Sequence, residues 1–221
     1  MKRIIVAIDG YSGTGKSSTA QLVAEGLNYT YIDSGAMYRA ITFHFLRNNV
    51  DLTNPKEIEE SMEKCELRFN ELGILLNGEL IENEIRSMVV NQNVSEVSAI
   101  SSVRRKLVEQ QREMSRNKGV VMDGRDIGTV VFPEAELKLF MTAQMGVRVK
   151  RRKKQLAKKG IIEYDEAIEQ NLAKRDEIDT TRSDSPLKQA TDAIVIDTSD
   201  LTLNEQVKKI VNLANNLIYE N

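Results

Sequence analysis

The sequence has little cysteine, no surplus of positive charge and no long apolar run. Its single cysteine, Cys65, cannot form an internal disulfide, which favours a reducing compartment. Lys and Arg number 31 against 33 Asp and Glu, and the resulting net charge of −2 disfavours duplex nucleic acid as the main partner. No apolar stretch approaches the ~18 residues of a membrane-spanning helix, and residues 1–3 lead into a short strand rather than a signal peptide. We therefore expect a cytoplasmic protein without membrane or nucleic-acid partners.

What the chain does contain is the composition of a folded domain. Its 221 residues are 41% hydrophobic and 29% charged, and they show no internal repeat and no low-complexity tract. This length is sufficient for one α/β domain with a proper core and an insertion. We expect a single domain spanning residues 1–221.

The most informative segment is residues 10–17, Gly-Tyr-Ser-Gly-Thr-Gly-Lys-Ser, which directly follows the apolar run at residues 4–9. Its spacing is that of a phosphate-binding loop between a buried strand and a helix N-terminus. Glycines let successive N–H groups point at phosphate oxygens, and the helix adds the positive end of its dipole. Lys16, expected in an exposed loop, can reach the β- and γ-phosphates, and Ser17 can offer its hydroxyl to Mg²⁺. The segment predicts binding of a nucleoside triphosphate.

Strand and helix patterns alternate along most of the chain. The apolar runs predict strands at residues 4–9, 30–32, 119–123, 137–142 and 193–197. Helical spacing predicts helices at residues 16–27, 36–46, 54–64, 95–117, 146–159 and 165–180, with a capping box at Thr202-x-x-Glu205 opening a last one. This alternation is typical of a parallel sheet with helices on its faces.

Residues 60–95 interrupt the alternation. Two segments, 65–69 and 73–81, are extended in pattern, and Asn77-Gly78 between apolar flanks is a strong hairpin signal. We expect an inserted antiparallel patch at 60–95, with the core formed by 1–59 and 96–221.

Arginines cluster after the expected strand ends, and the sequence has no evident guanine-reading Asn-Lys-x-Asp stretch. Transfer of a phosphoryl group between two phosphorylated molecules holds several anionic groups close together, which guanidiniums can clamp bidentately. A single arginine is more often a solvated surface residue, but the set is harder to dismiss. Its members are Arg39, Arg125, Arg148, Arg151, Arg152, Arg175 and Arg182.

Four segments make a family resemblance specific: residues 10–18, 33–39 (Asp-Ser-Gly-Ala-Met-Tyr-Arg), 123–131 (Asp-Gly-Arg-Asp-Ile-Gly-Thr-Val-Val) and 175–187. The chain resembles the bacterial cytidylate kinases from end to end, the hairpin-bearing insertion included. The resemblance implies a three-layer α/β P-loop kinase fold with a five-stranded parallel sheet, a small antiparallel-β insertion and a short helical lid at about 146–160. It also implies a monomer that transfers the γ-phosphate of ATP to CMP or dCMP, with Mg²⁺ as cofactor.

The resemblance also implies roles for individual residues. ATP would contact Gly10, Tyr11, Ser12, Gly13, Thr14, Gly15, Lys16, Ser17 and Ser18, with Lys16 and the lid residues Arg148, Arg151 and Arg152 acting on the transferring group. The CMP phosphate would be held by Ser34, Arg39, Arg125 and Arg182. The base would be read by Ser95, Arg104 and Asp126, and the ribose by Arg175 and Asp179. Mg²⁺ would be held by Ser17 and, through water, by Asp123.

Simpler interpretations accompany several of these residues. Arg175 and Asp179 are one helical turn apart and could form an i,i+4 salt bridge, and by spacing alone Ser95 and Arg104 are helix-surface residues. The 146–159 helix could be a solvated basic face. His44 lies in an apolar helical stretch and is expected to be packed, and Cys65 is expected to be structural.

Two other functions remain open. One is a kinase for another nucleoside monophosphate or a small metabolite, which an assay with a panel of acceptors would separate. The other is a nucleic-acid-associated ATPase that binds through the 146–159 helix, which the net charge disfavours.

Overall fold

The computed structural model describes residues 2–70, 72–158 and 160–219, and these fall into two compact units. Unit 1 comprises the chain up to residue 32 and from residue 115 onward, and unit 2 comprises residues 33–114. In the described ranges, no helix combines the length and the apolar character that crossing a membrane requires. Residue 71 of the expected insertion and residue 159 of the expected lid lie outside the described residues.

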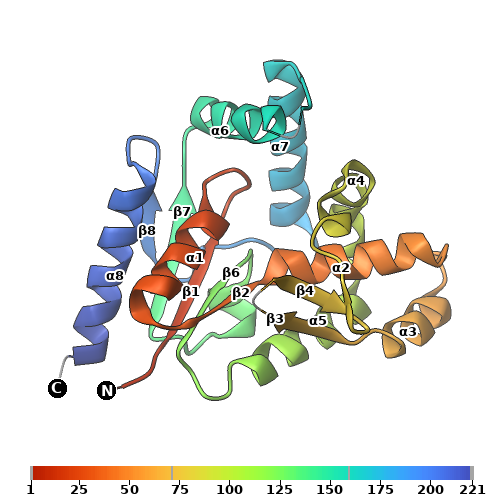
Figure 1. Ribbon diagram of the computed structural model, residues 1–221, viewed down its shortest axis with the longest axis horizontal. Coiled ribbons are helices and arrows are strands. Elements are labelled where there is room, and N and C mark those ends of the chain that lie inside the picture. Colours follow the sequence, from red (N-terminus) through yellow and green to blue (C-terminus); the bar gives the residue numbers. More distant parts are fainter. Residues whose placement is uncertain (1, 71, 159, 220–221) are drawn as a thin grey trace. The chain divides into compact units, whose positions relative to one another are not determined.

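Unit 1 is built on a five-stranded parallel sheet in the order β2-β6-β1-β7-β8 (Figure 1). The strands are β1 (Ile5–Gly10), β2 (Thr30–Asp33), β6 (Val120–Asp123), β7 (Leu137–Thr142) and β8 (Ile194–Asp197). All six residues of the central strand β1 are buried, which explains why this strand is apolar without alternation. Ile8 pairs with Asp123 on one side and with Leu139 on the other, so the polar ends of β1 and β6 lie at the same edge of the sheet. The expected sheet is confirmed.

Helices α1 (Lys16–Leu27) and α8 (Leu203–Tyr219) lie side by side against this sheet (Figure 1). Their buried residues include Val23 and Ile210, which join Val6 and Leu139 in one apolar core. The predicted capping box opens α8, since Thr202 N–H donates to Glu205 Oε2 at 2.8 Å. A second helix pair, α6 (Met145–Ala157) and α7 (Asp165–Thr181), packs through a separate apolar cluster of Val149, Ile168 and Leu172.

Unit 2 combines helices with a small antiparallel sheet. Its elements are α2 (Ser34–Arg47), α3 (Pro55–Glu63), β3 (Leu67–Asn70), β4 (Gly73–Leu76), β5 (Glu79–Leu80), a 3₁₀ turn η1 (Glu84–Arg86), α4 (Met88–Val97) and α5 (Ser101–Met114). Asn77 and Gly78 both have positive φ, 52° and 83°, and they join β4 to β5, which confirms the hairpin. His44 and Cys65 are buried as expected, and burial raises the pKa of the Cys65 thiol to about 11.

The helix expected at 95–117 is wrong, because the structure has two helices there with a break after Val97. α4 begins at Met88, so the segment at 60–95 is not antiparallel β throughout. Serine side chains compete with the backbone for hydrogen bonds and favour helix ends, and Ser98, Ser101 and Ser102 stand at the break. Arg104 stabilises the end of α4 by donating from Nη1 to the Ser98 carbonyl at 3.0 Å. The apolar spacing continues through this point, so it could not reveal the break.

Candidate functional site

The loop between β1 and α1 has the backbone that its glycines predict. Gly10 has a φ of 143°, and a Cβ at this position would lie 2.0 Å from the Met141 carbonyl oxygen, so no other residue fits here. Gly15 precedes α1 with a φ of 95°, in the left-handed region. Arg148 Cβ and a Leu172 methyl would contact a side chain at Gly13, so α6 and α7 press on this loop. The loop is thus a tight bend at a helix N-terminus, where backbone N–H groups can point at a bound anion.

Lys16, expected in an exposed loop, is instead buried with 5% exposure. The Nζ donates to the Tyr11 carbonyl at 2.6 Å and lies 3.5 Å from Thr14 Oγ1. Burial and the neighbouring Arg125 charge lower the pKa of Lys16 well below its ordinary value, while the nearby carboxylates oppose this shift. An anion bound on the loop would supply a counter-charge that stabilises the Lys16 ammonium.

Ser17 and Asp123 meet across the ends of α1 and β6. The Ser17 hydroxyl donates to Asp123 Oδ2 at 2.9 Å, and the Tyr31 hydroxyl donates to Asp123 Oδ1 at 2.7 Å. In the described part of the chain, no three His, Cys, Asp or Glu side chains converge as metal ligands. A hydroxyl and one carboxylate suit Mg²⁺, which keeps several waters and takes its other oxygens from phosphates. The donor set therefore fits Mg²⁺ bound together with a nucleotide.

Two of the three α6 arginines donate hydrogen bonds to backbone carbonyls of the phosphate loop. Arg148 is buried, pairs with Asp176 of α7 and donates from Nη1 to the Ser12 carbonyl at 3.1 Å. Arg151 donates to the Thr14 carbonyl at 3.1 Å and to Thr198 Oγ1 at 2.9 Å. Arg152 donates to Gln155 of its own helix at 2.8 Å.

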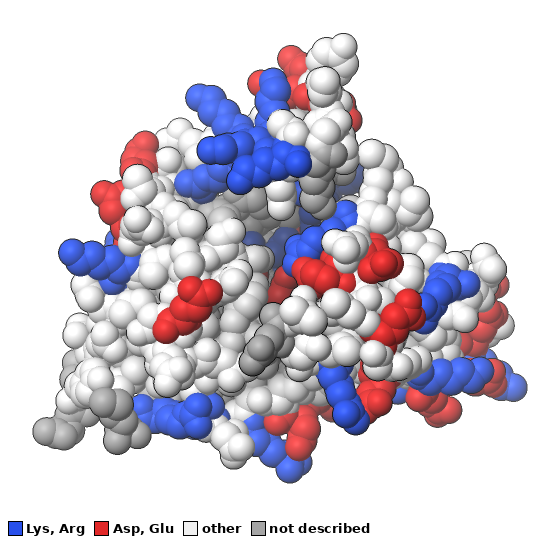
Figure 2. Space-filling view, viewed as in Figure 1, with Lys and Arg blue, Asp and Glu red and all other residues white. Residues whose placement is uncertain are grey.

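Other cations of α6 form a basic surface. Figure 2 shows Lys and Arg side chains gathered over α6, and besides its three arginines this helix contains Lys150, Lys153 and Lys154. Lys153 and Lys154 are exposed, whereas Arg148 is buried. Part of the helix is therefore a solvated basic face. Arg148 and Arg151 instead donate hydrogen bonds to carbonyls of the loop.

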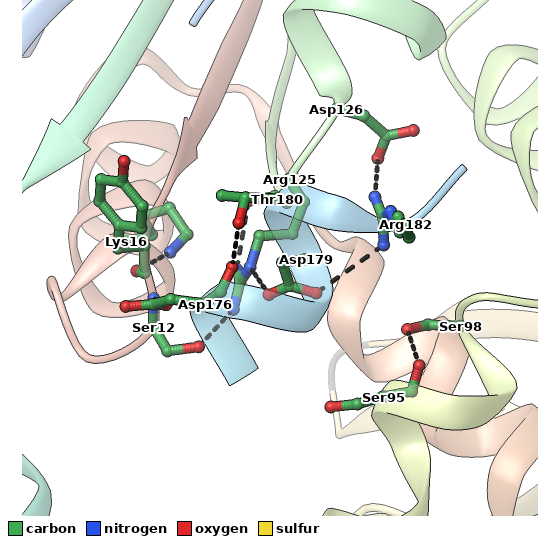
Figure 3. A network of polar contacts seen from close by, with 12 residues as sticks. Ser12, Lys16, Ser95, Ser98, Arg125, Asp126, Asp176, Asp179, Thr180 and Arg182 are labelled. Carbon is green, nitrogen blue, oxygen red and sulfur yellow. Dashed lines mark hydrogen bonds and ion pairs between the residues drawn. The ribbon is translucent and has the colours of Figure 1, made fainter. Parts of the chain in front are cut away.

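Arg125 lies just beyond β6 and joins the loop to α7. Its Nη2 donates to Ser12 Oγ at 2.8 Å, and its Nε donates to Asp179 Oδ2 at 2.6 Å (Figure 3). Burial raises the pKa of Asp179, but the guanidinium of Arg125 and the charges of Arg175 and Arg182 outweigh this and lower it overall. Asp179 thus pairs with Arg125, and Arg175 acts on it as a nearby charge.

Asp126 follows Arg125 and lies close to Arg182 of the segment after α7. Arg182 Nη2 is 3.7 Å from Asp126 Oδ1, and Arg182 Nη1 is 3.8 Å from Asp179 Oδ1 (Figure 3). Both side chains of the first pair are only 5% exposed. The structure therefore brings Arg125, Asp126, Asp179 and Arg182 together at the ends of β6 and α7.

In unit 2, Ser34 and Arg39 lie at the start of α2. This helix begins at Ser34, two residues earlier than expected, because Asp33 caps it by accepting the Ala36 N–H at 2.8 Å. Arg39 Nη2 lies 3.1 Å from Asp33 Oδ2. Arg39 Nε is buried and has no hydrogen-bond partner among the described residues, an arrangement that a bound anion would complete.

Ser95 and Arg104 also lie in unit 2, on α4 and α5. Arg104 is not at a helix surface as its spacing suggested, because it is only 2% exposed. Its guanidinium lies 5.4 Å from the centre of the Tyr38 ring. The Ser95 carbonyl accepts a hydrogen bond from Ser98 Oγ at 3.0 Å (Figure 3).

Three aspartates at these sites had no role in the sequence interpretation. Asp9 accepts the N–H groups of Ile127 and Gly128 at 2.8 and 2.7 Å, at the start of the π-helical turn η2 (Ile127–Val131). Asp176 accepts the Ser12 N–H at 3.0 Å, and Asp33 caps α2. The available signals were positional: Asp9 ends an apolar strand, and Asp176 lies in the segment 175–187 that carries part of the family resemblance. The partners of Asp9 and Asp176 are far away in sequence, and no local pattern encodes such contacts.

Comparison with known proteins identifies relatives over nearly the whole chain. The family model "Cytidylate kinase" matches residues 6–216. A cytidylate kinase of Cytophaga hutchinsonii is 51% identical over 97% of this chain and 94% of its own length. One of Alkaliphilus oremlandii is 48% identical over 96% of this chain and 98% of its own length.

The fold also has a distant structural relative. A crystal structure of shikimate kinase from Bacteroides thetaiotaomicron has a TM-score of 0.50 and 14% identity, and the match covers 98% of this chain and 99% of that chain. At this identity the likeness concerns the fold alone, and it agrees with the P-loop kinase architecture.

Proposed function

Because the chain belongs to the cytidylate kinase family, we propose that it transfers the γ-phosphate of ATP to CMP or dCMP, giving ADP and CDP or dCDP. The observation that carries the proposal is the family relationship at about half identity over nearly the full length. The phosphate loop with Lys16 and the Ser17–Asp123 pair supports it, because these groups suit a nucleoside triphosphate with its metal ion.

On the donor side, the loop residues 10–18 would cradle the ATP phosphates through backbone N–H groups. Lys16 would contact the β- and γ-phosphates and stabilise the charge that shifts between them during transfer. Ser17 and, through water, Asp123 would hold Mg²⁺, which when bound offsets phosphate charge. Arg148, Arg151 and Arg152 would complete this environment from α6, within the expected lid at 146–160.

On the acceptor side, four residues would hold the CMP phosphate: Ser34, Arg39, Arg125 and Arg182. The buried unpartnered Nε of Arg39 supports an anion at α2, where the helix N-terminus adds partial positive charge. Arg125 would keep its pair with Asp179, so its remaining N–H groups would face the phosphate.

The nucleoside would be read by polar side chains. Asp126 would accept a hydrogen bond from the cytosine N4 amino group, with Ser95 and Arg104 on other parts of the base. Arg175 and Asp179 would contact the ribose. The structure divides into units at residues 33 and 114 rather than at 60 and 95. The division of the chain into an insertion at 60–95 and a core stays a prediction.

The test is a coupled assay of ADP formation with CMP, dCMP, UMP and AMP as acceptors. We expect CMP and dCMP to give kcat/KM values at least ~100-fold above AMP, because a site built to hydrogen-bond one base rejects others strongly. Equal rates with all acceptors would favour a kinase of another specificity. ATP hydrolysis that depends on added DNA or RNA would favour the nucleic-acid-associated ATPase.

A cytoplasmic location, a monomeric state and the absence of membrane and nucleic-acid partners stay predictions from the sequence. Sedimentation of the purified chain with and without ATP and CMP would measure the oligomeric state directly.

A further inference from the structure

Asp176 holds two parts of the donor site at once. It lies on α7, three residues before Asp179. Its Oδ1 accepts the Ser12 N–H at 3.0 Å (Figure 3). Its Oδ2 forms an ion pair with Arg148 Nη1. The Asp176 side chain is 13% exposed and that of Arg148 is 9% exposed, so water screens the pair little. A single carboxylate therefore links the phosphate loop to helix α6.

Arg148 is fixed in orientation by this contact and two others. Its Nη1 also donates to the Ser12 carbonyl at 3.1 Å, and its guanidinium carbon lies 5.6 Å from the centre of the Tyr11 ring. Its Nε is buried and has no hydrogen-bond partner among the described residues. A buried donor without a partner is destabilising, and an anionic ligand would satisfy it. Nη1 of Arg148 is thus held in place by its partners, whereas its Nε remains without a hydrogen bond.

Ser12 also contacts a second arginine, Arg125. Ser12 Oγ accepts from Arg125 Nη2 at 2.8 Å, and Arg125 pairs in turn with Asp179. α7 therefore supplies one carboxylate to each of two guanidiniums that converge on Ser12. Buried guanidiniums without counter-charge would be strongly disfavoured, so the carboxylates allow both cations to stay close to the loop before a nucleotide binds.

We propose that Asp176 is a positioning residue for phosphoryl transfer, which orients Arg148 and the Ser12 segment of the phosphate loop as one unit. The inference rests on the proposed function and adds to it a residue with no assigned role. In the proposed site, Asp176 would touch neither nucleotide. It acts through Arg148, whose charge is needed when the γ-phosphoryl group is between donor and acceptor.

The test is Asp176→Asn, which keeps the size and an oxygen acceptor for the Ser12 N–H but removes the charge that pairs with Arg148. We expect kcat to fall roughly tenfold or more, with KM for CMP changed less than about twofold, because misorientation of a charged group acts on the transition state. The matched control is Asp165→Asn. It removes an exposed pair between the same two helices, Asp165 with Lys153, and should leave kcat unchanged.

A double-mutant cycle separates positioning from general stability. In an Arg148→Ala background, Asp176→Asn should lower kcat by less than about twofold further, because the group it orients is absent. Full additivity of the two losses would overturn the proposal, as would a normal kcat for Asp176→Asn. If Asp176→Asn melts below the assay temperature, Asp176→Glu, which keeps the charge but moves it, replaces it in the cycle with the same criterion.

The outcomes distinguish the inference from the function on which it rests. A wild-type chain that phosphorylates CMP while Asp176→Asn matches it contradicts the inference alone. A wild-type chain that phosphorylates no nucleoside monophosphate contradicts the proposed function and overturns the inference with it.

Discussion

At the residue scale, arginines of the candidate site form matched pairs with carboxylates rather than standing as isolated cations. Arg125 with Asp179, and Arg148 with Asp176, are ion pairs of low exposure, and Arg39 pairs with Asp33 in unit 2. Buried ion pairs contribute little net stability but fix the direction of their donors. We interpret them as a means of orienting guanidiniums whose other N–H groups would bind phosphate in the proposed function.

Lys16→Ala should lower kcat by about 100-fold or more, because such electrostatic contacts to a transferring group typically carry that factor. The burial of Lys16 means that the variant also leaves the Tyr11 carbonyl without its donor, so stability must be measured alongside activity. Steady-state kinetics and a thermal melt provide both values. Lys154→Ala, on an exposed position of α6, is the matched control, and a folded Lys16→Ala enzyme that retains more than about a tenth of wild-type kcat would contradict the role.

Asp126→Asn should reduce the preference for CMP over UMP by about tenfold or more. In the proposed role, the carboxylate would accept a hydrogen bond from the cytosine amino group but would oppose the uracil carbonyl, whereas an amide could donate to that carbonyl. The measurement is the ratio of kcat/KM for the two acceptors in wild type and variant. An unchanged ratio would remove Asp126 from base recognition and leave it a structural role, which includes its ion pair with Arg182.

At the element scale, α6 is tied to the loop by two residues one turn apart on its inner face. Arg148 and Arg151 contact the carbonyls of Ser12 and Thr14, while Arg152 bonds within its helix. The helix is therefore more than a solvated basic face. The helix can approach the loop this closely because Gly13 has no side chain, and a Cβ at Gly13 would lie 3.3 Å from Arg148 Cβ.

Alanine at Arg148 or at Arg151 should lower kcat by more than about tenfold with little change in CMP affinity, because in the proposed function these groups would act on the donor phosphates in the transition state. Arg152→Ala should have the smallest effect of the three. Turnover compared with CMP binding by calorimetry provides the check. Normal turnover in all three variants would show that the α6 arginines do not act on the transferring phosphoryl group.

The sequence was most informative about elements with strong local signals. The bounds of α1 match the prediction residue for residue, since the phosphate loop fixes its start and Asn28, with a φ of 54°, ends it. The hairpin at Asn77-Gly78 was equally clear from turn chemistry. The break between α4 and α5 escaped prediction because serine weakens a helix only slightly and the apolar period continues across it. The contact of Asp176 with Ser12 spans 164 positions, so only tertiary packing creates it.

At the scale of the whole molecule, stability is coupled to pH through Asp9. Burial raises the pKa of Asp9 to about 7 from an ordinary value of 3.8, against the opposing hydrogen bonds from Gly128 and Ile127. The folded chain therefore binds this proton more tightly than the unfolded chain does. The corresponding stabilisation is complete below pH 3.8 and is lost as pH rises to about 7, a change of about 4 kcal/mol.

Asp9→Asn removes this titration. The free energy of unfolding of wild type minus that of the variant should fall steadily between about pH 4 and 7 and then level off. Urea unfolding at four pH values across this range measures it, with Asp165→Asn as an exposed control. A difference that stays constant with pH would show that Asp9 does not titrate in this range.

The central claim is that the γ-phosphoryl group passes from ATP to a cytidine monophosphate. The most direct measurement uses ATP labelled in the γ-phosphate with excess CMP, followed by separation of the nucleotides and inorganic phosphate. We predict that the label appears in CDP, one equivalent for each ADP formed, and that Lys16→Ala nearly abolishes it. Label recovered in inorganic phosphate, or ADP formation that does not depend on CMP, would contradict the claim.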